Sequence, residues 1–137
     1  SSMPVQDIQM FKMDGGEGFT VFNGPDEQLV SGLAMGADGG IGGTYGVMPE
    51  LFLKIFKLTK QGEIKKAQEI QYAADAIIYK MCSGHGSMYG IIKAILRKRE
   101  GLEIGGVRKP MPALVESDMA IADECAKMID EAVKKYC

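Results

Sequence analysis

The sequence has no tryptophan, one histidine and three cysteines among its 137 residues. The cysteines are far apart and form no Cys-x-x-Cys or Cys/His cluster, so neither a disulfide framework nor a metal site is predicted. His85 has no nucleophile or carboxylate near it in the sequence, so we do not expect it to be catalytic. Because dinucleotide and P-loop glycine motifs are also absent, no cofactor is predicted.

Long hydrophobic runs and an excess of positive charge are absent as well. No apolar stretch approaches the ~18 residues that a membrane-crossing helix needs, and no N-terminal segment resembles a signal peptide. We therefore predict the cytoplasm as compartment and no membrane partner. The net charge of -2 gives no reason to expect nucleic acid, and the lysine and arginine runs fall in helical patterns typical of solvated faces. A content of 46% hydrophobic and 25% charged residues indicates a folded globular chain.

Two polar loops are the most informative feature that is present. Residues 19–22 alternate in a way that predicts a short strand, which leads into an acidic loop containing Asp26 and Glu27. Residues 36–45 then form a glycine-rich segment that needs support from other parts of the molecule to be ordered. The order strand, acidic loop, helix, glycine strand, helix is the repeat of a β/α barrel, where chemistry lies at the carboxyl ends of the strands.

Helical periodicity dominates the rest of the chain. Helices are predicted from Pro4 to the glycines at 15–16, from Leu29 to Gly36, and from Met48 to Gln61. Three more follow with no strand between them, and their apolar positions run over 64–81, 88–96 and 121–136. In the last of them we expect Cys125 to be buried and Ser117 to be the N-cap.

Four segments resemble the N-acetylneuraminate lyase branch of the pyruvate-dependent class I aldolases, whose other well-known branch is dihydrodipicolinate synthase. They are Asn23-Gly24, Asp26-Glu27, the Gly-Ala-Asp-Gly-Gly-Ile-Gly-Gly-Thr-Tyr run at 36–45, and Val-Arg-Lys-Pro-Met-Pro at 107–112. The chain departs from the family at Gly43, where the lyases usually have serine, and at Pro25. The resemblance implies an α/β fold with the last two β/α units of a TIM (β/α)8 barrel in residues 1–60. A C-terminal three-helix extension is implied for residues 61–137.

By this resemblance the chain begins just after the strand that carries the Schiff-base lysine, and Ser1-Ser2 resembles the end of that lysine's segment. The lysine and a proton-transferring tyrosine are expected upstream, so no catalytic residue is predicted in this chain. A complementary N-terminal barrel segment is the expected partner. The substrate-binding residues that the resemblance implies are Gly24, Asp26, Glu27, Ile41, Gly42 and Gly43.

The same residues also have local interpretations. Asp26 fits the N-cap of a helix and Glu27 its first turn, where the helix dipole favours negative charge. The resemblance adds that both carboxylates accept hydrogen bonds from the hydroxyls of a sugar-like substrate, and we predict both roles. Glycines at 42 and 43 fit the inside of a barrel strand, where small residues are needed because another chain or a ligand comes near. Because Gly43 lacks the serine hydroxyl, the natural substrate is predicted to be a 2-keto-3-deoxy sugar acid other than N-acetylneuraminate.

The function implied is that of a class I aldolase, which cleaves a sialic-acid-type sugar acid to pyruvate and an aldehyde sugar through a lysine Schiff base. A dihydrodipicolinate synthase-like or other 2-keto acid aldolase is one alternative, although Gly40-Ile41-Gly42-Gly43 argues against that synthase. The other is a non-catalytic half-barrel that binds or assembles through its open sheet edges. Family members are commonly tetramers, which makes a homo-oligomer the expected state.

Overall fold

The computed structural model describes residues 3–137, and the prediction made for Ser1-Ser2 lies outside this range. The described chain divides into two compact units. The first consists of the residues up to Tyr72 together with Tyr136–Cys137, and the second is Ala73–Lys135. The two units are treated separately below, and the predicted boundary at residue 60 stays a prediction.

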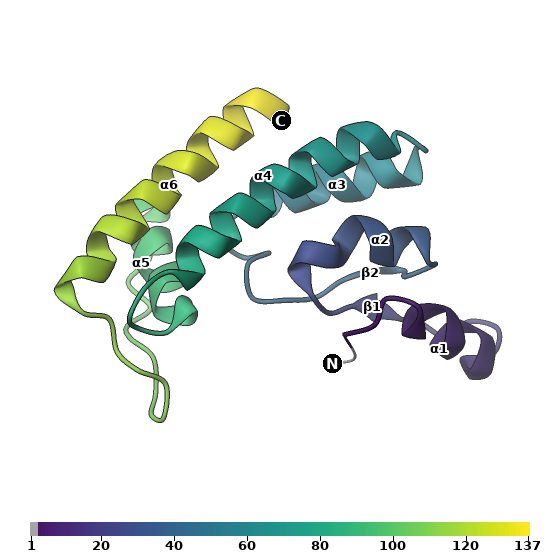
Figure 1. Cartoon of the computed structure of the whole chain (residues 1–137), viewed down its shortest axis with the longest axis horizontal. Coiled ribbons are helices and arrows are strands. Elements are labelled where there is room, and N and C mark those ends of the chain that lie inside the picture. The colour runs from purple at the N-terminus through teal and green to yellow at the C-terminus, as the bar shows by residue number, and fades with distance from the viewer. Residues whose placement is uncertain (1–2) are drawn as a thin grey trace. The chain divides into compact units, whose positions relative to one another are not determined.

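The first unit is built around a pair of parallel strands (Figure 1). Its elements are α1 (Asp7–Gly15), β1 (Phe22–Asn23), the 3-10 turn η1 (Asp26–Gln28), α2 (Leu29–Ala34), β2 (Gly39–Gly40), α3 (Pro49–Lys60) and the start of α4 (Ile64–Cys82). Phe22 pairs with Gly39 and Asn23 with Gly40. Flanking hydrogen bonds lengthen the ladder, since Asp38 N donates to Val21 O (2.8 Å) and Ile41 N donates to Asn23 O (3.0 Å). The predicted order of strands and helices is therefore confirmed.

Helix α2 covers the strand pair and also contacts α3. Its inward residues Leu29 and Leu33 are buried, as are Leu51, Phe52 and Ile55 on the amphipathic face of α3. Gly36, at φ 103°, ends the α2 segment in a conformation that L side chains rarely adopt. Each strand is only two residues long, so the strand pair by itself is too small to be stable. Packing against α2 therefore contributes much of what holds the strands in place.

A polar clamp fixes the amino ends of the strands. Lys12 Nζ of α1 lies 3.0 Å from Asp38 Oδ2 and 2.8 Å from Phe19 O, and Val21 N donates to the same Asp38 carboxylate at 2.7 Å. The Val21 amide and the Lys12 ammonium lower the pKa of Asp38. Because Lys12 takes up the Phe19 carbonyl, the strand predicted at 19–22 begins only at Phe22.

The second unit contains the rest of α4 with α5 (Met88–Glu100) and α6 (Glu116–Tyr136). Ion pairs connect the three helices: Lys80 with Glu124 (2.6 Å), Arg99 with Asp130 (2.8 Å), and Lys98 with Asp123. The buried interior includes Cys125, fully inaccessible as predicted, and burial raises the pKa of its thiol to about 11. Across the described residues, no helix is both long and apolar enough to cross a membrane.

The start of α6 departs from the prediction. Ser117 lies inside the helix, so it is not the N-cap. The fully buried Asp118 accepts a hydrogen bond from Val115 N (3.0 Å), which is one half of a capping box. The Asp118 carboxylate also accepts hydrogen bonds from His85 N (2.8 Å) and Gly86 N (2.9 Å). Val115 N, together with these two backbone donors, lowers the pKa of Asp118. His85 thus has a carboxylate neighbour that local sequence does not indicate, with Nδ1 3.6 Å from Asp118 Oδ1.

Candidate functional site

The two predicted polar loops meet at the carboxyl ends of β1 and β2. Asp26 follows β1, and its Oδ2 atom accepts hydrogen bonds from the backbone N (2.7 Å) and the Oγ1 (2.5 Å) of Thr44, which follows β2. Both residues are buried, with 7% and 1% of their surfaces exposed. A carboxylate taken out of water needs such donors. The link therefore fixes one loop against the other.

The N-cap role predicted for Asp26 is wrong. Pro25 occupies the N-cap position of η1, and no side chain caps this turn. Asp26 is the first residue of the turn, and its carboxylate points across to Thr44 instead of back along its own backbone. Two donors on the neighbouring loop outweigh the single backbone N–H that an N-cap carboxylate would accept locally.

Gly42 has a steric reason to be glycine. A Cβ atom at this position would overlap Oδ1 of Asp26, so any side chain would push the carboxylate off Thr44. The group that approaches this backbone is Asp26 of the same chain, and the approach of another chain or a ligand stays a prediction. One carboxylate oxygen is thus held by Thr44 while the other lies against the bare backbone of Gly42.

The other predicted site residues lie around this link. Gly24 directly follows β1, while Glu27 lies in η1 and Gly43 lies between Gly42 and Thr44, all three half-buried. Among the described residues Glu27 has no hydrogen-bond or ion-pair partner. Ile41, after β2, is 69% exposed. The structure therefore places all six predicted residues at the same ends of the two strands.

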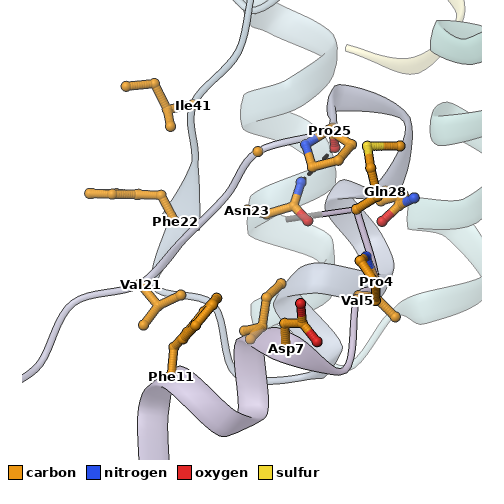
Figure 2. Close-up of a pocket in the computed structure, with 13 residues that line it drawn as sticks. Pro4, Val5, Asp7, Phe11, Val21, Phe22, Asn23, Pro25, Gln28 and Ile41 are labelled. Carbon is orange, nitrogen blue, oxygen red and sulfur yellow. Dashed lines mark hydrogen bonds between the residues drawn. The ribbon is translucent and has the colours of Figure 1, made fainter. Parts of the chain in front are cut away.

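Ile41 belongs to an uncovered apolar surface. Its side chain extends in the same direction as that of Phe22, which is 55% exposed (Figure 2). Next to them, a cavity of about 240 Å³ lies between α1 and the end of β1. Its lining includes Val5, Ile8, Phe11, Val21, Asn23 and Pro25.

Three further polar residues, none of them among the predicted substrate-binding residues, support the loops. Asn23 is buried and donates through Nδ2 to Pro25 O at 2.6 Å. Tyr45 stacks on Phe52 with ring centroids 4.3 Å apart, and burial, with Asp26 nearby, raises the pKa of its hydroxyl far above the usual range. Gln71 of α4 donates to Asp26 O in η1 and accepts from Val30 N in α2. Asn23 and Tyr45 lie in the segments that carry the resemblance and Gln71 lies in a predicted helix, but no local pattern indicates the burial or the distant partners that define their roles.

Within residues 3–137, no group of three His, Cys, Asp or Glu side chains could hold a metal ion. The arrangement offers hydrogen-bond acceptors, since the Asp26 Oδ1 atom lies against the backbone of Gly42 and Glu27 is the next residue of the same turn. Acceptors without an opposing cation suit a ligand rich in hydroxyl donors.

Comparison with known proteins extends this picture. Residues 2–131 match the model of the dihydrodipicolinate synthetase family. An N-acetylneuraminate lyase of Mediterraneibacter gnavus is 60% identical to this chain, and the match covers 99% of this chain and 43% of the lyase. An N-acetylneuraminate lyase of Fusobacterium nucleatum is 36% identical, and the match covers 78% of this chain and 36% of that lyase. The solved structure of Ruminococcus gnavus sialic acid aldolase, a TIM barrel, superposes with a TM-score of 0.97 at 59% identity, covering all of this chain and 46% of that one.

The chain thus spans less than half the length of the relatives it matches, and it corresponds to their C-terminal part. The family match covers nearly every residue. Three of the four segments that carry the resemblance, at 23–24, 26–27 and 36–45, lie at β1 and β2, and the Asp26–Thr44 link joins the loops that follow these strands. The chain belongs to the dihydrodipicolinate synthetase family.

Proposed function

We propose that this chain is the C-terminal part of an N-acetylneuraminate lyase-like aldolase, which cleaves a 2-keto-3-deoxy sugar acid to pyruvate and an aldehyde sugar. The observation that carries the proposal is the 60% identity to an N-acetylneuraminate lyase over 136 residues, including both polar loops. Related solved structures agree with this chemistry. They include a catalytic lysine mutant of the Ruminococcus gnavus sialic acid aldolase, a Fusobacterium nucleatum N-acetylneuraminate lyase complexed with pyruvate, and a Clostridium difficile relative in complex with mannosamine.

The proposal makes β1 and β2 the last two strands of the barrel and α4, α5 and α6 its C-terminal extension. The exposed Phe22 and Ile41 support it, because two neighbouring strands of a closed barrel turn such side chains into a shared interior. The cavity between α1 and β1 supports it too, since it leaves room beside the unpaired edge of β1. A complementary N-terminal barrel segment is the partner required, and a homo-oligomer of complete barrels in the cytoplasm is the expected form.

The nucleophile of this reaction lies outside the chain. In the complete barrel a lysine amine condenses with the ketone of the sugar acid, and the resulting iminium accepts the electron pair of the bond that breaks. This chain binds the sugar side. Glu27 and the Asp26 Oδ1 atom accept hydrogen bonds from substrate hydroxyls, and the absence of a side chain at Gly24 lets the backbone approach them.

Gly43 is proposed to set the choice of sugar. It follows Gly42 and precedes Thr44, whose position Asp26 fixes, so a serine placed there would bring a hydroxyl donor to a defined place. Glycine leaves that place open to a bulkier or differently substituted sugar tail. The measurement is Gly43→Ser in a complete barrel, with relative kcat/KM compared over several 2-keto-3-deoxy sugar acids. Unchanged ratios would remove Gly43 from the proposal.

The central experiment uses a complete barrel, made by joining the preceding part of the Mediterraneibacter gnavus lyase to this chain. We expect it to cleave N-acetylneuraminate or a related sugar acid, and to gain a covalent mass adduct after pyruvate and borohydride. This chain alone should gain no adduct and serves as the control. An adduct without sugar-acid cleavage would favour another 2-keto acid aldolase of the family, such as the dihydrodipicolinate synthase type. No adduct in the complete barrel would favour a non-catalytic assembly module.

A further inference from the structure

Gln71 is a buried glutamine whose side chain enters the backbone of another segment. It lies on α4, in the first unit, and only 5% of its surface is exposed. Its Nε2 donates to Asp26 O at 3.1 Å, and its Oε1 accepts from Val30 N at 3.2 Å. Both partners lie more than 40 residues earlier in the chain, at the turn that follows β1.

These two partners would bond to each other in a continuous α-helix. The N–H of residue 30 would donate to the carbonyl of residue 26 in the i→i-4 pattern. Here Leu29 N donates to Asp26 O in a 3-10 turn, and the Gln71 amide fills the gap between Asp26 O and Val30 N. The side chain thus acts as a two-sided bridge that separates η1 from α2.

This separation sets where the acidic side chains point. Successive residues differ in direction by about 120° in a 3-10 turn and by about 100° in an α-helix. If the gap closed, Asp26 and Glu27 would rotate relative to β2, and the Asp26 carboxylate would move away from the Thr44 hydroxyl. Displacements of about 1 Å among substrate-positioning groups can cost about a hundredfold in rate.

We propose that Gln71 is a positioning residue for the sugar side of the site: it holds the 3-10 turn open and thereby aims Asp26 and Glu27 at the substrate. The inference rests on the proposed function, because it needs these carboxylates to bind sugar hydroxyls. It gives α4 a part in substrate selection, although the residue touches no substrate itself.

The test compares Gln71→Met with Gln68→Met in the complete barrel. Methionine keeps the length of the side chain and removes both hydrogen bonds, and Gln68 is an exposed residue of the same helix. For Gln71→Met we expect KM for the sugar acid to rise about tenfold or more, with the rate of pyruvate trapping by borohydride within about twofold of wild type. Gln68→Met should match wild type in both assays.

Other outcomes overturn different claims. Equal sugar-acid kinetics in the two methionine variants, with an active wild type, would overturn the role of Gln71 alone. If Gln71→Met lowered pyruvate trapping and sugar-acid cleavage by the same factor, Gln71 would contribute only to the general stability of the fold, and the positioning role would be overturned. A wild-type barrel that traps pyruvate and cleaves no sugar acid would overturn the proposed function, and the sugar-side role with it.

A second variant keeps the test decisive if Gln71→Met does not fold. A protonated glutamic acid at position 71 retains one donor and one acceptor, whereas the ionised form has acceptors only. Burial raises the pKa of an introduced carboxyl into the working range. The kcat/KM ratio of Gln71→Glu to wild type should therefore rise as the pH is lowered from 8 to about 5. A ratio that does not change with pH would contradict the bridge.

Discussion

Replacing Thr44 by valine tests the link between the two loops. Valine has nearly the same shape, so the change removes the Oγ1–H donor to Asp26 Oδ2 (2.5 Å) and keeps the backbone donor at 2.7 Å. Hydrogen bonds to charged groups contribute about 1.5–3 kcal/mol. Because both side chains are buried, water cannot replace the lost donor. We expect the free energy of unfolding to fall by about 1.5–3 kcal/mol.

The measurement is urea unfolding of the chain followed by circular dichroism, with Thr59→Val as the matched control. Thr59 Oγ1 donates to Ile55 O (2.8 Å) within helix α3, a neutral and half-buried bond whose loss should cost less than about 1 kcal/mol. In a double-mutant cycle, Thr44→Val and Asp26→Asn should show a coupling of about 1 kcal/mol or more. If Thr44→Val destabilises no more than Thr59→Val, or if the cycle shows no coupling, the reasoning about the link is refuted.

Three further predictions follow from the packing and the titrating groups. Gly42→Ala should lower kcat/KM of the complete barrel about tenfold or more, because the added Cβ displaces the Asp26 carboxylate. Gly46→Ala is the control and should leave kcat/KM unchanged, since a Cβ at Gly46 meets nothing within 4 Å. Equal effects of the two substitutions would contradict the steric account. Asp118 has a lowered pKa in the folded chain, so its contribution is complete above its unfolded pKa of about 3.9 and disappears as the pH falls through the folded value. The difference in thermal midpoint between wild type and Asp118→Asn should therefore shrink below about pH 4, and a difference that persists at lower pH would contradict this. Cys125, buried and with a thiol pKa of about 11, should react with iodoacetamide only after unfolding, while Cys82 reacts in the native chain; rapid native alkylation of Cys125 would be inconsistent with the structure.

Much of the fold could be predicted because the spacing of apolar residues along the chain indicates the helices. The apolar spacing over 48–56 gives the buried face of α3, and Gly36 and Gly62, both with positive φ, end the preceding helical segments. The strands were harder, since each has two residues, and a tertiary contact from Lys12 decides where the first begins. The N-cap of α6 was missed for a different reason. The signal was present as Asp118 three residues after Val115, but Ser117 has the stronger intrinsic capping preference.

The sequence predicts which residues lie at the ends of the two strands, but it does not predict the contacts that these residues make. The motif placed Asp26, Gly42 and Gly43 on neighbouring strand ends, and the structure brings these ends together. What the sequence could not give is that the partner of Asp26 is Thr44, because no local rule selects one hydroxyl at a distance of 18 residues. Gln71 is a more distant case. A glutamine at an inward helical position looks like a tolerated polar residue until its two backbone partners are known.

The two adjacent acidic residues can therefore have separate roles. Asp26 is buried, and one of its oxygens is held by two donors, so its position is set before any substrate arrives. Glu27 is half-buried and has no partner among the described residues, so it can meet a hydroxyl without first giving up another bond. A site that binds a polyol needs both properties. An acceptor in a fixed position determines where the sugar chain binds, and an acceptor without a protein partner adds a further hydrogen bond to a sugar hydroxyl. The proposed bridge from Gln71 adds to the hydrogen bond from Leu29 N to Asp26 O within the turn, and it would keep both acidic residues in that turn by bonding to Asp26 O and Val30 N.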